Sequence, residues 1–246
     1  MQIEYSQLNL IGGREENQDR VMVISTPESA LLIVIDGMGG HADGAKAAEV
    51  ACETIAEAFA SIEKPVFDPQ GFLHRAIGRA HANLVALGEG LSLEVRPRAT
   101  CVACIVQDNA SFWAHVGDSR IYQLRDNGVL ERTRDHSHVE LLLQDGLIRE
   151  DELLDHPMRN FVECCLGGDP VIPGMNITNR KSLLPGDVLL ACTDGFWSGL
   201  TDEEIGWLGQ SQGTLQEQLN MLGKKAVKAG GQFADNTSAA ALRWQG

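Results

Sequence analysis

The sequence lacks long hydrophobic runs and a secretion signal. None of its 246 residues stands in an apolar stretch near the roughly 20 residues that a membrane-spanning helix needs. Residues 1–10 show no basic start followed by an apolar core, which is the pattern of a secretory signal. We therefore expect no membrane association and a cytoplasmic location.

A disulfide framework and an excess of basic residues are also missing. The six cysteines are dispersed through apolar segments: Cys52, Cys101, Cys104, Cys164, Cys165 and Cys192. This pattern indicates reduced, buried thiols in a reducing compartment. The 34 acidic residues exceed the 20 basic ones, which gives a formal net charge of -14. Because such a field repels polyanions, we expect no nucleic-acid partner.

What the sequence does contain is a set of short apolar runs rich in β-branched residues. They predict strands at 21–24, 31–35, 101–106, 112–116, 121–124, 188–192 and 237–242. Asp108-Asn109 separates two such runs and Asp126-Asn127-Gly128 follows a third, and both favour tight hairpin turns. Consecutive strands in the middle of the chain are therefore expected to be antiparallel.

Longer apolar periods predict helices at about 44–59, 72–87 and 215–228. Thr201 with Glu204, and Thr214 with Glu217, match the capping box, in which two side chains satisfy backbone donors at a helix start. Strands and helices do not alternate regularly along the chain. Segregated layers of sheets and helices therefore fit better than a doubly wound parallel sheet.

The chain shows no internal repeat and no long linker, so we expect a single domain over residues 1–246. The segment at about 134–170 is polar and dense in His, Asp and Glu. A polar connecting segment of this length is typical of a mobile flap over a site.

Four acidic residues share one local context. Asp36, Asp118, Asp194 and Asp235 each stand beside Gly, Ser or Asn, just before or after an apolar strand. A buried strand holds its end in place, and a small neighbour lets a ligand come close. Mg²⁺ and Mn²⁺ prefer carboxylate, carbonyl and water oxygens, so these residues predict a cation site. Taken singly, each could instead be a turn or capping residue, and spacing alone leaves open whether they meet.

Five blocks of sequence, in order along nearly the whole chain, resemble the metal-dependent protein phosphatases of the 2C family in their bacterial form. The blocks are Gly13-Arg14-Glu15-Glu16-Asn17-Gln18-Asp19, Asp36-Gly37-Met38-Gly39-Gly40-His41, Gly117-Asp118-Ser119-Arg120, Thr193-Asp194-Gly195 and Asp235-Asn236-Thr237-Ser238. The second block is highly specific to the family, whereas Thr-Asp-Gly alone would be weak.

The resemblance implies an α+β fold, a four-layer α-β-β-α sandwich with two central antiparallel sheets flanked by helices. It also implies an enzyme that uses two to three Mn²⁺ or Mg²⁺ ions and a metal-bridging water to hydrolyse phosphoserine and phosphothreonine in proteins. The substrates would be proteins phosphorylated by a bacterial Ser/Thr kinase, and we expect a monomer.

The same resemblance assigns roles to individual residues. Asp36 would bridge two metal ions, and the Gly37 carbonyl would bind one of them. Asp194 and Asp235 would complete the other site, and Asp118 would help to hold a third ion.

Four further residues would act beside the ions. Asp19 would orient metal-bound water, and Asn236 would lie behind the ligands. Arg14 would grip the substrate phosphate, because its planar guanidinium donates two parallel hydrogen bonds. His41 is a candidate proton donor, since imidazole changes charge near neutral pH, or else a structural hydrogen-bonding group.

The chain departs from the family pattern in two places. Arg98-Ala99-Thr100 stands where Gly-Thr-Thr is common, and Val162-Glu163-Cys164-Cys165 stands in the flap where an Ile/Leu-Thr-Arg-Ala-like run is usual. Two alternatives remain open: an inactive phosphoprotein-binding module of the same fold, and a hydrolase of small phosphate esters. The run Ala-His-Val-Gly-Asp-Ser-Arg at 114–120 resembles phosphatases that accompany type VI secretion systems.

Overall fold

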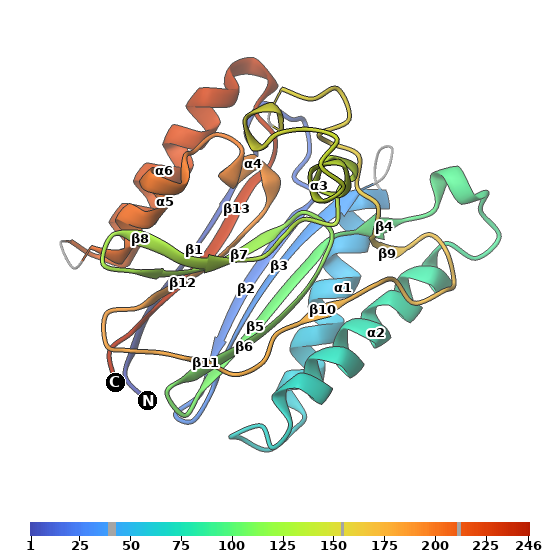
Figure 1. Cartoon of the computed structure of the whole chain (residues 1–246). Helices are drawn as coiled ribbons and strands as arrows, with labels where there is room; N and C mark the ends of the chain where they lie inside the picture. Colours follow the sequence, from blue (N-terminus) through green and yellow to red (C-terminus); the bar gives the residue numbers. More distant parts are fainter. Residues whose placement is uncertain (39–42, 154, 211–212) are drawn as a thin grey trace.

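The computed structural model of the chain describes residues 1–38, 43–153, 155–210 and 213–246. Within these residues, two antiparallel sheets pack face to face and helices cover both outer faces (Figure 1). The predicted α-β-β-α sandwich is therefore confirmed. His41 lies outside the described residues.

One sheet, called here the β13 sheet, runs in the order β1-β13-β12-β7-β8. Its strands are β1 (Ile3–Leu10), β7 (Arg120–Arg125), β8 (Gly128–Arg132), β12 (Val188–Cys192) and β13 (Thr237–Trp244). The predicted turn between β7 and β8 is present, because Asp126 and Asn127 both adopt positive φ angles, 50° and 67°. The sequence missed β1, an edge strand whose half-exposed polar residues hide its apolar alternation.

The other sheet, called here the β3 sheet, is built around β2 (Asp19–Ser25), β3 (Ala30–Met38), β5 (Cys101–Gln107) and β6 (Ala110–Val116). Four two-residue strands extend it: β4 (Arg98–Ala99), β9 (Leu166–Gly167), β10 (Asn176–Ile177) and β11 (Lys181–Ser182). The predicted Asp108-Asn109 turn joins β5 to β6. Because strands of two residues carry no periodicity, these four could not be predicted from the sequence pattern.

Helices α1 (Asp43–Ala60) and α2 (Pro69–Leu87) cover the β3 sheet, and α4 (Asp194–Trp197), α5 (Asp202–Gly206) and α6 (Leu215–Gly230) cover the β13 sheet (Figure 1). The short α3 (His138–Gln144) lies in the flap segment. Single 3₁₀ turns occur at Leu93–Val95, Glu150–Glu152, Trp207–Gly209 and Gly231–Phe233.

Local side chains explain where these helices begin. Both predicted capping boxes are formed: Thr201 with Glu204 before α5, and Thr214 with Glu217 before α6. Helix α2 starts three residues earlier than the sequence pattern suggested, at Pro69. There Asp68 accepts a hydrogen bond from the Gly71 amide, and proline at the first helical position has no amide hydrogen that needs a partner.

The core follows from strands that are apolar on both faces. On β3, Leu31, Ile33 and Ile35 pack toward α1 and α2, whereas Leu32 and Val34 pack against the β13 sheet. All five side chains are fully buried, and each contributes about 1.5–3 kcal/mol of hydrophobic stabilisation. This packing holds the ends of the central strands in fixed positions.

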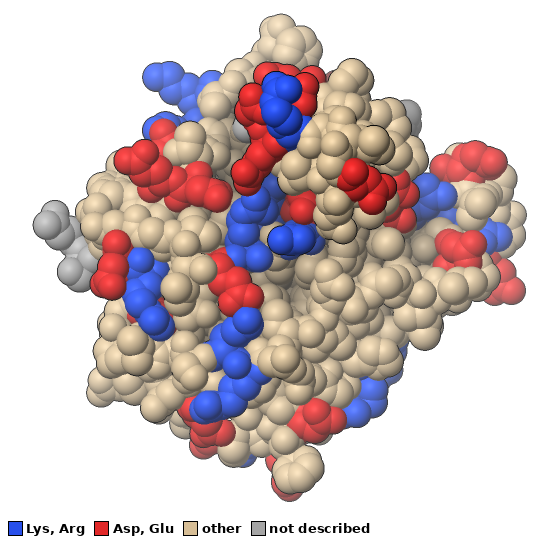
Figure 2. Space-filling view, in the orientation of Figure 1, with Lys and Arg blue, Asp and Glu red and all other residues tan. Residues whose placement is uncertain are grey.

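The surface carries charges of both signs. On the face shown in Figure 2, basic side chains form small groups among acidic ones, with wide uncharged areas between them. Within the described residues, no helix is both long enough and apolar enough to cross a membrane.

Two helical glycines give a matched test of the packing. A Cβ at Gly206 would lie 2.6 Å from the Asn127 carbonyl oxygen in the β7–β8 turn, whereas a Cβ at Gly78 meets no atom within 4 Å. We predict that Gly206→Ala lowers the free energy of unfolding by about 1–3 kcal/mol through overpacking. Gly78→Ala should raise it by about 0.5–1 kcal/mol, because alanine favours the helix. Urea denaturation measures both values, and a stabilising Gly206→Ala would contradict the packing.

Candidate active site

The β3 sheet places two carboxylates side by side at one end of the sandwich. Asp19 on β2 stands directly opposite Asp36 on β3 in the antiparallel register. Thr193, at the end of β12 in the other sheet, donates its hydroxyl hydrogen to Asp19 Oδ2 over 3.0 Å. Only 1% of Asp19 is exposed, so this carboxylate is held both by its strand and by the facing sheet.

The β13 sheet supplies two more carboxylates at the same end. Asp194 follows β12 and Asp235 precedes β13, and these two strands are antiparallel neighbours. The segments after β12 and before β13 approach so closely that a Cβ at Gly195 would lie 2.1 Å from the Asn236 carbonyl oxygen. Glycine is therefore required next to Asp194.

Asp118 lies in the connection from β6 to β7, which passes from one sheet to the other. The preceding Gly117 has a φ of +101°, and a Cβ there would lie 2.6 Å from Thr100 Cγ2. Only glycine fits this turn. The crossover thus carries Asp118 to the space between the sheet ends.

The cleft of about 720 Å³ at this end is lined by four aspartates that are far apart in the sequence, Asp36, Asp118, Asp194 and Asp235. The other lining residues are Arg14, Glu15, Glu16, Gln18, Gly37, Met38, Asn160, Val162 and Asn236. The structure therefore brings together the side chains whose meeting the sequence spacing left open.

Burial and mutual repulsion disfavour the charged forms of these carboxylates. Burial raises the pKa of Asp36 well above its usual value, and the charges of Asp19 and Asp194 raise it further. The same two effects raise the pKa of Asp118 to about 8, that of Asp19 to about 7 and that of Asp194 to about 6. The cluster therefore has a strong tendency to take up positive charge, as protons or as cations.

Arg14 already provides one positive charge. Its Nη2 lies 2.7 Å from Asp235 Oδ2, and both side chains are half-exposed. The hydrogen bond to Asp235 raises the pKa of Arg14. The guanidinium thus lies at the rim of the cleft, paired with one of its aspartates.

Asn236 holds the loop that carries Arg14. Its amide nitrogen donates to the carbonyl oxygens of Ile11 and Glu16, over 2.9 and 3.0 Å, and its Oδ1 accepts from the Gln18 amide over 2.8 Å. A single buried side chain on the strand-end segment therefore sets the position of the whole loop.

Gly37 has no room for a side chain. A Cβ there would lie 2.0 Å from the Gly44 carbonyl oxygen, and its own amide donates to the Gln18 carbonyl over 3.1 Å. Ala99, at one of the departures from the family pattern, pairs with Gly37 from β4 and is fully buried. Ala99 is therefore the strand neighbour of Gly37, whose carbonyl is a predicted metal ligand.

The donor set of the cleft fits a hard divalent cation. Within the described parts of the chain, no group of three or more His, Cys, Asp or Glu side chains is arranged so that it could hold a metal ion. One oxygen of Asp235 is instead paired with Arg14. Mg²⁺ needs only one or two carboxylates, because waters and other oxygens complete its octahedron. The aspartates and the Gly37 carbonyl supply such oxygens.

Sequence reasoning missed three residues that support Asp118. Arg120 makes a bidentate ion pair with Asp135 over 2.7 and 2.8 Å, and its guanidinium carbon lies 3.4 Å from the centre of the Trp197 ring. Trp197 Nε1 donates to the Asp118 carbonyl oxygen over 3.0 Å. Arg120 stood in one of the matched blocks, but only the structure shows what it contacts.

The segment predicted as a flap lines the cleft. Asn160 and Val162 lie on its wall, and Arg159 lines the adjacent cavity of about 570 Å³. Within the flap, His138 Nδ1 lies 2.7 Å from Glu163 Oε1, and the Glu163 amide donates to the His136 carbonyl over 2.8 Å. These contacts tie its two ends together. That the segment moves stays a prediction.

The chain is similar to known proteins over most of its length. The sequence profile described as Protein phosphatase 2C matches residues 11–230. The serine/threonine phosphatase stp of Listeria monocytogenes is 29% identical over 224 residues, which are 89% of this chain and 87% of that protein.

Solved structures share the fold. The serine/threonine phosphatase of S. agalactiae superposes with a TM-score of 0.88 at 27% identity, covering 99% of this chain and 100% of that one. The catalytic domain of the phosphatase PstP in complex with two manganese ions gives 0.82 at 25%, covering 99% of each chain. PppA, a regulatory component of the type VI secretion system in Pseudomonas aeruginosa, gives 0.80 at 25%, covering 98% and 97%. Because the profile spans most of the sequence and these structures share its whole sandwich, the chain belongs to the protein phosphatase 2C family of phosphoprotein phosphatases.

Proposed function

We propose that the chain hydrolyses phosphoserine and phosphothreonine in proteins, with two to three Mn²⁺ or Mg²⁺ ions bound in the aspartate cleft. The observation that carries this proposal is that the four strand-end aspartates line one cleft together with Arg14. The relatives named as serine/threonine phosphatases, and the PstP structure with two manganese ions, support it.

We assign the ion-binding groups from the lining of the cleft. Asp36, the Gly37 carbonyl, Asp194 and Asp235 would hold two ions, with Asp36 between them, and Asp118 would hold a third. When bound, divalent cations acidify a water molecule and neutralise charge on the phosphoryl group during in-line displacement.

The remaining roles belong to the protein's own groups. Arg14 would leave Asp235 and donate two parallel hydrogen bonds to the substrate phosphate, since cations in the cleft would take over that carboxylate. Asp19, fixed beside Asp36 by Thr193, would orient water there. Asn236 keeps the Arg14 loop in place. For His41 the role of proton donor rests on the sequence alone.

The physiological setting is part of the same proposal. The substrates would be proteins phosphorylated by a bacterial Ser/Thr kinase, and the similarity to PppA supports a place beside type VI secretion. All six cysteines are free, as expected in a reducing compartment, so we propose that the protein acts in the cytoplasm. We also propose that it acts as a monomer.

Removing a predicted ligand tests the catalytic role of the cleft. Asp36→Asn and Asp194→Asn should each lower Mn²⁺-dependent phosphate release from a phosphothreonine peptide by roughly 100-fold or more, because an ion is worth several kcal/mol to the transition state. Asp126→Asn, in the exposed β7–β8 turn, is the matched control and should keep full activity.

Three outcomes of this assay separate the alternatives. Peptide binding by the parent without turnover, unaffected by a chelator, would indicate an inactive binding module. A much higher kcat/KM on small phosphate esters than on phosphopeptides would indicate a small-ester hydrolase. Full activity in both aspartate variants would remove the cleft from the mechanism.

The raised carboxylate pKa values predict how the metal-free protein responds to pH. A carboxylate whose pKa is higher in the folded state binds more protons there, so stability falls as pH rises past the unfolded value. With folded values of about 6, 7 and 8 for Asp194, Asp19 and Asp118, the free energy of unfolding should fall between about pH 4 and pH 8. Denaturation across that range, with and without Mn²⁺, measures the effect. Mn²⁺ should restore most of the loss, and a rising stability without metal would contradict the account.

The shape of the Arg14 guanidinium gives a separate test. Arg14→Ala should lower kcat/KM for a phosphopeptide by about 10- to 100-fold, the equivalent of one or two charged hydrogen bonds. Arg14→Lys should recover little, because an ammonium group cannot bind two phosphate oxygens in parallel. Mn²⁺ affinity should not fall in either variant. The Arg14 guanidinium, which competes with Mn²⁺ for Asp235, is removed by alanine and replaced by a weaker partner in the lysine variant. Recovery of full activity by lysine would contradict this role.

A further inference from the structure

The crossover that carries Asp118 turns at Gly117, and glycine is the residue with the greatest backbone freedom. The φ of Gly117 is +101°, and a Cβ there would clash with Thr100, so a larger residue cannot stiffen the turn. The direction in which the chain delivers Asp118 depends on the two backbone angles of this glycine. Groups outside the crossover must therefore fix the peptide units on either side of it.

His136, near the start of the flap segment, holds both of these peptide units. Its Nδ1 accepts from the Gly117 amide over 3.3 Å, and its own amide donates to the Gly117 carbonyl oxygen over 2.9 Å. The first hydrogen bond holds the peptide unit before Gly117. The second holds the peptide unit that joins Gly117 to Asp118. A single residue thus fixes both backbone angles of the glycine.

The ring of His136 is itself held in place. It lies against the ring of His115, a buried residue of β6, with ring centres 4.5 Å apart and planes tilted by 32°. His115 Nε2 donates to the Arg134 carbonyl oxygen over 2.8 Å. Burial and the neighbouring His115 lower the pKa of His136 to about 4. The ring is therefore neutral at pH 7, and Nδ1 keeps the lone pair that accepts from Gly117.

The next peptide unit of the crossover is held from α4. Trp197 on this helix donates its Nε1 hydrogen to the Asp118 carbonyl oxygen over 3.0 Å. Asp194, another predicted ion ligand, is the first residue of the same helix. His136 and Trp197 together hold three successive peptide units around Asp118 and set its place relative to Asp194.

We propose that His136 is a positioning residue for the ion at Asp118. Its Nδ1 and its amide fix the turn at Gly117, and that turn aims the Asp118 carboxylate into the cleft. The role rests on the proposed function, because that function places an ion at Asp118. A group that orients an ion ligand from behind contributes about 10- to 100-fold to the affinity for the ion.

Two substitutions of His136 separate the acceptor atom from the stacked ring. Asparagine carries an oxygen in the place of Nδ1, because both atoms are bonded to Cγ, but it has no ring. Phenylalanine keeps a ring that can lie on His115 but has no acceptor. If His136 acts through its acceptor atom, His136→Asn should behave like the parent and His136→Phe should not.

Titration of the metal-free proteins with Mn²⁺ at pH 7 measures the effect, with the free ion followed by electron paramagnetic resonance. Asp118→Asn identifies the binding step that depends on Asp118, because that step is lost. His136→Phe should weaken the same step by at least about tenfold. His136→Asn should stay within about threefold of the parent. Both variants should keep the other Mn²⁺ binding steps, which shows that the fold is intact.

Hydrogen exchange of the Gly117 amide, followed by NMR, tests the contact without metal or substrate. The amide should exchange at least about tenfold faster in His136→Phe than in the parent, because its acceptor is gone. In His136→Asn it should exchange at close to the parent's rate.

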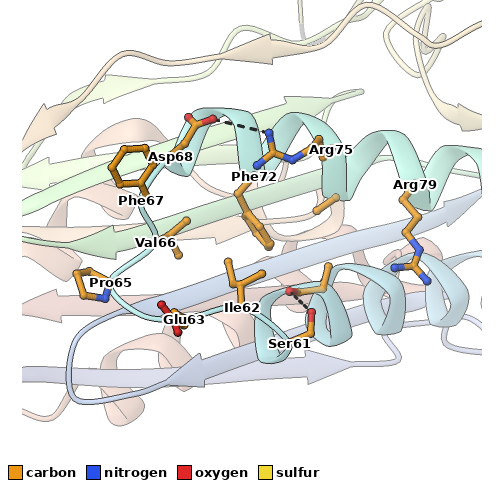
Figure 3. A pocket seen from close by; sticks show the side chains of 12 residues that line it. Ser61, Ile62, Glu63, Pro65, Val66, Phe67, Asp68, Phe72, Arg75 and Arg79 are labelled. Carbon is orange, nitrogen blue, oxygen red and sulfur yellow. Dashed lines mark hydrogen bonds and ion pairs between the residues drawn. The ribbon is translucent and has the colours of Figure 1, made fainter.

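His74 offers a matched control. It is exposed on α2, next in sequence to Arg75, which lines a separate cavity between α1 and α2 (Figure 3). His74→Phe makes the same substitution outside the crossover and the flap, so Mn²⁺ binding and Gly117 exchange should both match the parent.

Three results would overturn the proposal. They are Mn²⁺ binding by His136→Phe equal to that of the parent, a loss in His136→Asn as large as in His136→Phe, and unchanged Mn²⁺ binding by Asp118→Asn. A parent protein that binds the Asp118-dependent Mn²⁺ but releases no phosphate from phosphopeptides would contradict the proposed function instead. The binding results would then still support the role of His136.

Discussion

Repulsion among desolvated carboxylates is the constraint on which the site depends. The strand register sets Asp19 against Asp36, and the antiparallel ends of β12 and β13 set Asp194 near Asp235. The backbone of each aspartate is held by the packed strand on which it lies or which it adjoins. The negative charge must therefore be balanced by protons, by Arg14 or by cations. The raised pKa values of Asp36 and Asp194 show that these carboxylates bind protons more readily than usual.

The sandwich can impose this arrangement because its central strands are buried on both faces. Hydrophobic packing on β3 and β13 supplies the stability that a cluster of like charges removes. Hydrogen bonds then refine the positions: Thr193 joins the two sheets at Asp19, and Asn236 joins β13 to the Arg14 loop. Fold and site are thus coupled through a few strand-end contacts.

The sequence predicted most of this fold because its long strands and helices carry strong apolar periods and local caps such as Thr214 with Glu217. It missed β1 and the two-residue strands, whose pairing is decided by tertiary contacts. The aspartates could be chosen from strand-end context, but their meeting followed only from resemblance. The stacking of Arg120 on Trp197 depends on a contact between distant segments that no spacing encodes.

The central claim is that divalent cations replace protons in the aspartate cleft. Calorimetric titration of Mn²⁺ into the metal-free protein at pH 7, in two buffers of different ionisation enthalpy, tests it most directly. The raised pKa of Asp118, about 8, predicts that binding releases protons and that the observed heat depends on the buffer. Binding with identical heats in both buffers, or no binding, would contradict the account.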